Sequence, residues 1–358
     1  MGRSVLIAAG GTGGHIYPGL ALAEKFRAAD FDVIWIGSKI GLESRIVPRS
    51  DIPFEAIPSR GLRGKNFLQQ IWALFIFFSG FLFSVAIVLR IRPSLVVGMG
   101  GFVSAPVGLA SWVCRCPLVI HEQNAVVGLA NRILSRVAIR IFEAFPNSFP
   151  ASLGAISIGN PIRDEIILAR SEIKRKLIGV DIRLLVFGGS RGARILNELV
   201  PKALNTLENV RIKVLHQSGF EGFRETKNRY NATESHIDAI VRPFIDNMSD
   251  AYSESDLVIC RSGAITVSEI ATVGIGSILI PYRHAVDDHQ TKNAEYLKSA
   301  GAAIVLPESE LTQKSLGGTL RRLLEEKRHL NKMANAARRL GHAEAASRIV
   351  NRCLDLCR

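Results

Sequence analysis

Short hydrophobic runs alternate with longer segments of helical periodicity along almost the whole chain. Runs such as Val5–Ala9 and Leu95–Gly98 are nearly all apolar, which is typical of parallel strands buried on both faces. Between such runs, segments such as Ile16–Ala29 and Ala193–Leu207 repeat apolar residues every three to four positions. This alternation predicts an α/β protein with parallel sheets and right-handed crossovers. The predicted strands are Val5–Ala9, Val33–Gly37, Leu95–Gly98, Leu118–His121, Ile139–Phe142 and Ile156–Gly159, followed by Leu184–Phe187, Ile212–His216, Ile240–Pro243, Leu257–Cys260, Ser277–Pro281 and Ala303–Leu306.

The two halves of the chain repeat one local design. VLIAAGGTGG (Val5–Gly14) and LLVFGGSRG (Leu184–Gly192) each pass from an apolar strand through a double glycine and a small hydroxyl residue into a helix. The Asn-Pro pair in Gly159–Arg163 breaks regular structure, and 358 residues suit two domains of roughly 150 residues each. We therefore predict two doubly wound domains, residues 1–162 and 163–339. The last helical stretch, Ala336–Leu356, can pack on either, including a return of about residues 340–358 onto the first.

Composition narrows the class of protein. A net charge of +13 accompanies 47% hydrophobic residues, which excludes a disordered chain and calls for an anionic partner. Five cysteines in 358 residues make no disulfide framework and indicate reduced thiols in a cytosolic protein. The N-terminal MGRSVLIAAGG has too short an apolar stretch for a signal peptide.

Acidic residues are missing from Ala56 to His121, and inside this window Ile71–Leu89 contains nineteen residues without a charge. As a helix this run would be about 28 Å long, close to the thickness of a bilayer's hydrocarbon core. A spanning helix would, however, place the predicted strands before and after it on opposite sides of a membrane. We therefore disfavour spanning and keep two alternatives. One is a buried crossover helix, and the other is an interfacial helix with basic flanks that docks on an anionic membrane.

Polar and glycine-rich segments follow several predicted strands, where open α/β sheets bind ligands. Gly10–His15 offers four glycines, backbone N–H groups for an anion and an imidazole suited to act as a base near pH 7. The alternative is a tight turn with a structural histidine. His121–Asn124 supplies Glu122 as a second candidate base, or as a group that orients one.

The second half carries related segments. Gly188–Gly192 repeats the glycine loop with a guanidinium built in, and Cys260–Glu269 joins a strand to a helix whose first N–H groups could seat a phosphate. Glu269 could accept both hydroxyls of a ribose, or could be an ordinary solvated charge. Within His284–Asn293, the amide of Gln290 could bind hydroxyls or bases.

Other classes fit less well. The loops do not follow GxGxxG with a later acidic residue, which disfavours a dinucleotide-dependent dehydrogenase. No His, Cys or carboxylate cluster has metal-ligand spacing. Zinc and aromatic RNA-binding motifs are missing from the sequence, which disfavours nucleic acid as the partner.

The motifs together resemble the MurG family, the membrane-associated N-acetylglucosaminyltransferases of peptidoglycan synthesis in glycosyltransferase family 28. The resemblance implies a GT-B fold, in which two Rossmann-like domains face a deep cleft, with no bound metal or cofactor. The matching motifs are GGTGGHIYPGLALA (Gly10–Ala23), SRGLRGK (Ser59–Lys65), GMGGFVSAP (Gly98–Pro106), HEQNAVVGLANR (His121–Arg132), GNPIR (Gly159–Arg163), GGSRGARILN (Gly188–Asn197), HQSG (His216–Gly219), CRSGAITVSE (Cys260–Glu269) and HQTKNA (His289–Ala294).

Carried over residue by residue, the resemblance implies that the second domain binds the donor, UDP-N-acetylglucosamine. It places Ser190 and Arg163 on the diphosphate, Ile245 near the uracil, Glu269 on the ribose and Gln290 on the sugar hydroxyls. Phosphate contacts would come from Ala264, Ile265, Thr266, Val267 and Ser268, and contacts to the donor sugar from Thr12, Gly13, Gly14 and Asn124.

The implied reaction is an inverting transfer to the 4-hydroxyl of the muramoyl sugar of lipid I, which gives lipid II. His15, helped by Glu122, would be the base. The first domain would bind the acceptor on the cytoplasmic face of the bacterial inner membrane. A cell-wall or division complex is a further expected partner there. The alternatives are another GT-B glycolipid glycosyltransferase or UDP-sugar epimerase, and a non-catalytic binder of anionic lipid.

Overall fold

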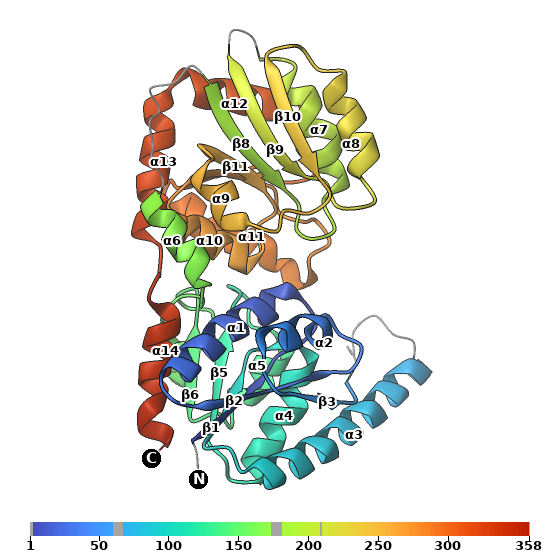
Figure 1. Cartoon of the computed structure of the whole chain (residues 1–358), viewed down its shortest axis with the longest axis vertical. Helices are drawn as coiled ribbons and strands as arrows, with labels where there is room; N and C mark the ends of the chain where they lie inside the picture. Colours follow the sequence, from blue (N-terminus) through green and yellow to red (C-terminus); the bar gives the residue numbers. More distant parts are fainter. Residues whose placement is uncertain (1–2, 60–66, 173–180, 208–209, 358) are drawn as a thin grey trace. The chain divides into compact units, whose positions relative to one another are not determined.

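The computed structural model describes residues 3–59, 67–172, 181–207 and 210–357. The chain forms two compact units (Figure 1). Unit 1 comprises Met1–Arg163 and His342–Arg358, and unit 2 comprises Asp164–Gly341. Each unit is a parallel sheet with helices on its faces, which confirms the predicted fold class. Residues 60–65 of the SRGLRGK motif lie outside the described residues.

Unit 1 is built on a seven-stranded sheet in the order β3-β2-β1-β4-β5-β6-β7, with every neighbouring pair parallel. The chain runs outward from β1 to β3 and then resumes beside β1 at β4, so the order reverses between β1 and β4. Doubly wound sheets hold ligands at the carboxyl ends of the strands beside such a reversal. The strands are β1 (Ser4–Ala8), β2 (Asp32–Ser38), β3 (Phe54–Ile57), β4 (Leu95–Gly98), β5 (Leu118–Glu122), β6 (Arg140–Glu143) and β7 (Ile156–Ser157).

Alternating residues of the central strands feed two cores, because successive side chains of a strand point to opposite faces. Val5 and Ile7 belong to the core that α1 and α14 cover, and Leu6 and Ala8 belong to the core that α3 and α4 cover. The helices of unit 1 are α1 (Gly13–Ala28), α2 (Glu43–Ile46), α3 (Phe67–Ile91), α4 (Gly101–Val113), α5 (Leu129–Leu134) and α14 (Ala345–Cys353), with 3-10 turns η1 (Val47–Ser50), η2 (Ala151–Leu153) and η4 (Leu354–Cys357).

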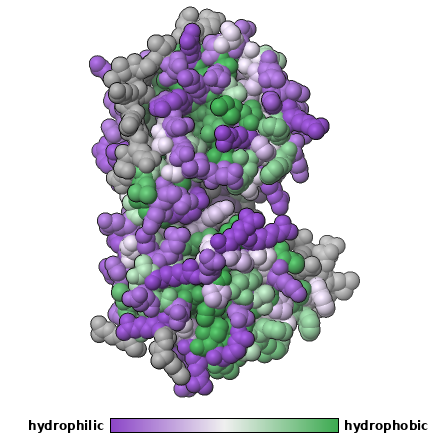
Figure 2. Space-filling view, in the orientation of Figure 1, coloured by the Kyte–Doolittle hydropathy of each residue, from purple (hydrophilic) through white to green (hydrophobic). Residues whose placement is uncertain are grey.

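The long hydrophobic run forms most of α3, which crosses from β3 to β4. Because β3 and β4 belong to one sheet, both ends of α3 are tied to that sheet, and the helix packs against α4. Among the described residues, Trp72–Ile91 is the helical stretch long and apolar enough to cross a membrane, and 28% of it is buried in the protein. Figure 2 shows hydrophobic side chains along the part of unit 1 that α3 occupies. The chain therefore crosses from β3 to β4 through α3, as in the crossover alternative. Most of the surface of this helix, however, is not buried by the rest of the protein.

Unit 2 repeats the same winding with six parallel strands in the order β10-β9-β8-β11-β12-β13. The reversal point lies between β8 and β11. Helices α7 and α12 pack together on the core of one face. The strands are β8 (Asp181–Phe187), β9 (Arg211–Gln217), β10 (Ile237–Arg242), β11 (Leu257–Cys260), β12 (Gly276–Leu279) and β13 (Ala303–Val305); the helices are α6 (Asp164–Glu172), α7 (Arg194–Leu204), α8 (Phe223–Asn231), α9 (Met248–Ser253), α10 (Ala264–Val273), α11 (His289–Ser299), α12 (Gln313–Glu325) and α13 (Lys327–Arg339), with the 3-10 turn η3 (Val286–Asp288).

Two expectations about the elements are corrected. Strand β3 was not predicted, because its four residues FEAI carry too short and too polar a pattern. The single helical stretch Ala336–Leu356 is two helices, since α13 ends at Arg339 and α14 begins at Ala345. Gly341 lies in the break, where a Cβ would come within 2.6 Å of the Ala271 carbonyl oxygen.

Helix α14 completes the core of unit 1, although the whole of unit 2 (Asp164–Gly341) lies between β7 and this helix in the sequence. Ile349, Val350 and Cys353 lie in the same core cluster as Val5 and Ile7 of β1. We expect Ile349→Ala to lower the free energy of unfolding by about 2–5 kcal/mol, because it removes a fully buried side chain and leaves a cavity.

Urea denaturation measures this loss, and limited proteolysis identifies the unit that opens first. Asn351→Ala, on the exposed face of the same helix, is the matched control and should change stability by less than about 0.5 kcal/mol. Equal stability of the two variants would contradict the role of α14 in the core.

Candidate active site

The candidate site of unit 1 lies at the reversal point of its sheet. The carboxyl ends of β1, β4 and β5 lead into Gly10–His15, Met99–Gly101 and Gln123–Asn124 respectively. The structure thus brings together the glycine loop and the HEQN segment, which are more than 100 residues apart in the sequence.

A buried carboxylate holds the glycine loop in place. Gly11 has a φ of +102°, and its N–H donates to Glu43 Oε2 over 3.1 Å. The other oxygen of Glu43 accepts hydrogen bonds from the backbone and hydroxyl of Ser38, over 2.9 and 2.8 Å. A Cβ at Gly10 would lie 2.5 Å from Glu43 Oε1, so the glycine allows the loop to approach the carboxylate. Thr12 is the N-cap of α1 and is exposed, and Gly13 and Gly14, the first residues of the helix, are partly exposed.

The ring of His15 is fixed by one hydrogen bond and by two glycines. Its Nδ1 lies 2.8 Å from Gln123 Oε1. A Cβ at Gly100 would lie 3.2 Å from Nδ1 and Cε1 of the ring, and one at Gly101 would lie 3.4 Å from Cδ2. Both glycines have positive φ, so their backbone packs where side chains could not. His15 itself is half-buried and open to a ligand.

Glu122 is fully engaged within the protein. It is 2% exposed, and Oε1 accepts from the N–H and side-chain amide of Asn124 over 2.9 and 3.3 Å. Oε2 accepts from the Gly128 N–H over 3.0 Å and from Asn131 Nδ2 over 2.9 Å. With two donors on each oxygen, the carboxylate is placed to shape the loop of residues 124–128. This geometry favours Glu122 as a positioning residue, one of the two roles that the sequence left open.

Arg163 lies at the end of unit 1, and its guanidinium carbon is 4.8 Å from the centre of the Tyr17 ring of α1. This cation–π contact orients a positive charge beside the helix that begins with the glycine loop. Asn124, which is partly buried, is held by Glu122 and by Ser148, whose hydroxyl donates to the Asn124 carbonyl oxygen.

In unit 2, the carboxyl ends of β8, β9 and β10 bring together the glycine loop after β8 and the segment after β10. Gln217, at the end of β9, donates to the Gly189 carbonyl oxygen over 2.8 Å and accepts from the Ile245 N–H over 2.7 Å. One side chain therefore sets the spacing between the Ser190 loop and Ile245. Ser190 is exposed, whereas the Ile245 side chain is buried.

Helix α10 begins beside the reversal point of the unit 2 sheet, with Gly263 as its N-cap. Ala264 and Val267 have buried side chains, so they can meet a ligand through backbone N–H groups, while Ile265, Thr266 and Ser268 are partly exposed. Glu269, which is 7% exposed, accepts a hydrogen bond from Tyr252 Oη over 3.0 Å.

Gln290 is tied to the same region by its backbone and its side chain. The Ser262 hydroxyl donates to the Gln290 carbonyl oxygen over 2.8 Å, and Gln290 Oε1 accepts from the Tyr282 N–H over 2.9 Å. The amide of Gln290 therefore keeps its NH2 group as the donor that it can offer a ligand.

Four residues of these sites were not assigned a role from the sequence: Glu43, Gln123, Gln217 and Tyr252. The HEQN segment gave a local signal for Gln123, because four polar residues after an apolar strand are unusual in a plain loop. Gln217 lies in the HQSG motif that follows a strand, but that motif suggested no role for its side chain. Glu43 and Tyr252 lie outside the motifs and have no such signal. Within the described part of the chain, no three His, Cys, Asp or Glu side chains cluster as metal ligands would.

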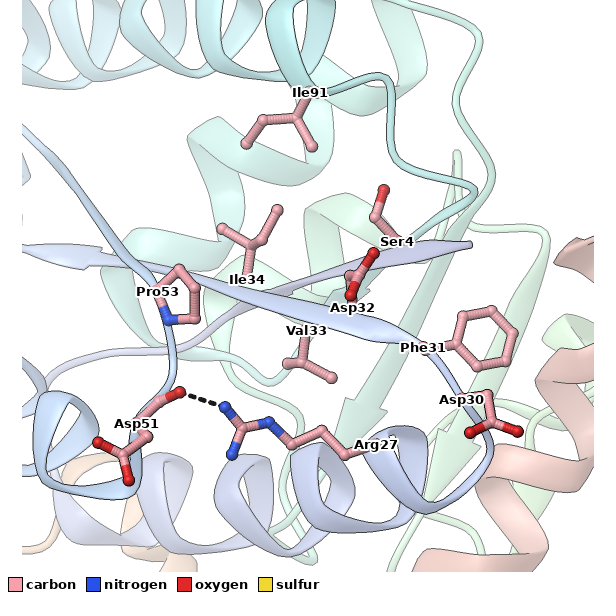
Figure 3. A pocket seen from close by; sticks show the side chains of 10 residues that line it. All are labelled: Ser4, Arg27, Asp30, Phe31, Asp32, Val33, Ile34, Asp51, Pro53 and Ile91. Carbon is pink, nitrogen blue, oxygen red and sulfur yellow. Dashed lines mark hydrogen bonds between the residues drawn. The ribbon is translucent and has the colours of Figure 1, made fainter. Parts of the chain in front are cut away.

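A pocket of about 890 Å³ lies elsewhere on unit 1, at the amino ends of β1 and β2 (Figure 3). Ser4, Asp32 and Ile91 line it, and Arg27 reaches the Asp51 carbonyl oxygen beside it. Because it opens at the opposite ends of the strands from His15, it is separate from the candidate site.

Comparison with known proteins matches both units to one family. Residues 5–143 match the glycosyltransferase family 28 N-terminal domain, and residues 183–349 match the glycosyltransferase family 28 C-terminal domain. The chain belongs to glycosyltransferase family 28. It is 44% identical over 355 residues, 99% of each chain, to the UDP-N-acetylglucosamine–N-acetylmuramyl-(pentapeptide) pyrophosphoryl-undecaprenol N-acetylglucosamine transferase of Methylococcus capsulatus.

Two solved structures have the same fold as this chain. The crystal structure of Acinetobacter baumannii MurG matches with a TM-score of 0.85 and 36% identity over 98% of each chain. The UDP-GlcNAc 2-epimerase of Neisseria meningitidis, solved with UDP-GlcNAc bound, matches with a TM-score of 0.68 and 13% identity over 99% of this chain and 100% of that one. The second likeness shows a shared fold alone, so the fold by itself does not separate a transferase from an epimerase. The family 28 match confirms the resemblance inferred from the motifs, and the chain is a glycosyltransferase.

We expect Glu122→Gln to lower the free energy of unfolding by about 1–3 kcal/mol, because the new NH2 group would face N–H donors inside the protein. Thermal or urea denaturation measures this change. Glu55→Gln is the control in the same unit, since Glu55 pairs with Arg90 on the surface, and its loss should cost less than about 1 kcal/mol. A Glu122→Gln protein with unchanged stability and abolished glycosyl transfer would instead assign Glu122 as the base.

Proposed function

We propose that this protein transfers N-acetylglucosamine from UDP-N-acetylglucosamine to the 4-hydroxyl of N-acetylmuramyl-(pentapeptide) pyrophosphoryl-undecaprenol, lipid I, and so makes lipid II for peptidoglycan. Full-length relatives at about 44% identity are named as transferases for these two substrates, which supports the proposal. The observation that carries the chemistry is His15, a half-buried imidazole held at the mouth of a glycine loop by Gln123 and Gly100.

Unit 2 would bind the donor. Backbone N–H groups at the start of α10 and the loop at Ser190 suit a diphosphate, because helix N-termini and glycine loops offer unpaired donors to anions. Glu269, oriented by Tyr252, suits the two hydroxyls of a ribose. Ile245 would lie near the uracil and Gln290 would bind sugar hydroxyls. In unit 1, Thr12, Gly13, Gly14 and Asn124 would contact the donor sugar.

The reaction would proceed as one displacement with inversion. His15 takes the proton of the acceptor hydroxyl, and the oxygen forms a bond to the anomeric carbon of the donor sugar. The bond from that carbon to the diphosphate oxygen breaks, and its electron pair leaves with UDP. Arg163 and the N–H groups of α10 would stabilise the charge that grows on the diphosphate.

His15→Ala should reduce the turnover number by about 10²–10⁴-fold, which is the usual contribution of a general base. The measurement is transfer of radiolabel from UDP-N-acetylglucosamine to lipid I. His329→Ala changes an exposed histidine of unit 2 and should leave the rate unchanged. The wild-type rate should also persist with a chelator present.

The same assay separates the alternatives. Wild-type turnover by His15→Ala would overturn the base assignment. Release of a 2-epimer without transfer would indicate an epimerase, and a protein that binds neither UDP nor lipid I would support a lipid-binding role instead.

The uncovered face of α3 supports a second part of the proposal, docking on an anionic membrane at the cytoplasmic face of the inner membrane. Trp72, Leu74, Phe75, Phe78, Leu82, Phe83 and Leu89 are exposed on α3, and Trp112 and Val113 are exposed at the end of α4, which packs against it. Soluble proteins rarely expose so large an apolar surface. Arg92 and Arg115, both exposed, lie just after these two helices and would meet lipid phosphates. The acceptor carries an undecaprenyl chain, so a bilayer is the surface on which this substrate resides.

Replacing Phe75 and Phe78 together by Ser should weaken binding to vesicles of phosphatidylglycerol by about tenfold or more, because two aromatic side chains lose apolar burial. Vesicle co-sedimentation measures the binding. Phe220→Ser is the matched control, since Phe220 is 75% exposed but belongs to unit 2. Binding that ignores both the double substitution and the anionic lipid content would contradict the docking proposal.

A further inference from the structure

A chain of hydrogen-bonded side chains ends on the ring of His15. His121 Nε2 lies 2.9 Å from the Gly159 carbonyl oxygen, and His121 Nδ1 lies 3.0 Å from Gln123 Nε2. Gln123 Oε1 in turn lies 2.8 Å from His15 Nδ1. His121 and Gln123 are at most 1% exposed, so water cannot exchange for any of these partners without opening the site.

The direction of each bond follows from groups that can only accept. A carbonyl oxygen carries no hydrogen, so Nε2 of His121 must donate to Gly159. Burial lowers the pKa of His121 to about 4, with the bond to Gly159 acting in the opposite direction and the neighbouring His15 adding to the decrease. The ring is therefore neutral near pH 7, and its Nδ1 is an acceptor for the NH2 group of Gln123.

A second carbonyl fixes the same orientation of the amide. Gln123 Nε2 also lies 3.0 Å from the His121 carbonyl oxygen, which again can only accept. The amide oxygen is therefore the atom that faces His15. Since an amide oxygen cannot donate, His15 Nδ1 must carry the hydrogen of this bond.

The backbone on which these side chains sit is also held. Asn131 Nδ2 donates to the His121 carbonyl oxygen over 3.0 Å, and Asn160 Nδ2 donates to the Gln123 carbonyl oxygen over 3.1 Å. Gly159, the far end of the chain of bonds, has a φ of +89°, and a Cβ there would lie 2.3 Å from His342 Cβ. The accepting carbonyl therefore has little freedom to turn away.

We propose that His121 and Gln123 are positioning residues that hold neutral His15 as its Nδ1–H tautomer and leave Nε2 as the basic nitrogen. Within the described residues, no protein group hydrogen-bonds to His15 Nε2. In the reaction the acceptor's O–H bond breaks, its proton moves to Nε2, and the ring becomes an imidazolium that keeps its Nδ1–H bond to Gln123. The catalytic part of this inference rests on the proposed function, but the tautomer is a property of the free protein.

Nitrogen-15 NMR of the full-length protein with ring-labelled histidine tests the tautomer without substrate, because protonated and unprotonated ring nitrogens have different chemical shifts. The signals of His15 are assigned by their loss in His15→Gln. At about pH 8, the neutral His15 ring of the wild-type protein should show a protonated Nδ1 and an unprotonated Nε2.

Two variants separate positioning from simple packing. Gln123→Met is close in volume but has no acceptor, so His15 should shift toward the Nε2–H form, and kcat should fall by about 10–100-fold while KM for UDP-N-acetylglucosamine changes by less than about threefold. Gln123→Glu loses the donor to His121 but keeps an acceptor for His15 Nδ1–H. It should therefore retain the wild-type tautomer and a kcat above that of Gln123→Met.

The outcomes are distinct. A wild-type His15 with Nε2–H, or a Gln123→Met protein in which Nδ1–H still dominates, would overturn the positioning proposal whatever the rates. A wild-type Nδ1–H signal that is lost in Gln123→Met supports it. If that signal behaves as expected but His15→Ala retains full transfer, the base assignment of the proposed function fails and the assignment of the tautomer stands.

Discussion

The carboxyl end of β5 buries three consecutive polar side chains, and the arrangement of the site in unit 1 follows from the need to satisfy them. His121, Glu122 and Gln123 are at most 2% exposed. A buried polar group left without a partner costs about 1–3 kcal/mol, so each of these side chains must find donors or acceptors inside the protein. Their partners come from four other segments: the linker at Gly159, the loop of residues 124–128, α5 and the start of α1. One strand end thereby fixes the positions of these four segments relative to one another.

The part of this arrangement that could be predicted from the sequence is the part encoded locally. Glycine-rich segments after apolar strands identified the carboxyl edges, and hydrophobic runs located the strands, because burial on both faces leaves a continuous apolar signature. The role of Glu43 could not be predicted in this way. It lies outside the recognised motifs, and its partners at Gly11 and Ser38 become neighbours only when β1 and β2 pair. Strand β3 lies at the edge of the sheet, where four residues of which only Ile57 is buried give no such signature.

Helix α3 illustrates how one sequence can satisfy two environments. Its buried side includes the small residues Ala73, Gly80 and Ser84, and at Gly80 a Cβ would come within 2.3 Å of the Pro58 carbonyl oxygen. Close approach on this side leaves the large side chains, such as Phe75 and Phe78, pointing away from the protein. The sequence pattern alone shows an almost uniformly apolar helix, because both the packing side and the outer side are hydrophobic. Only the sheet topology separates the two, since it ties both ends of α3 to strands of one sheet, β3 and β4.

Both units place a glutamine at the carboxyl end of a strand to join segments of the site, and the chemistry of the amide explains this choice. Gln123 donates to His121 and accepts from His15, while Gln217 donates to the Gly189 carbonyl oxygen and accepts from the Ile245 N–H. A carboxylate could make only the accepting bond, and an ammonium only the donating one. An amide makes both and does not titrate, so the polarity of each junction stays the same as pH changes. In unit 2 it also adds no negative charge beside the loop that would receive a diphosphate, where a carboxylate would repel the ligand.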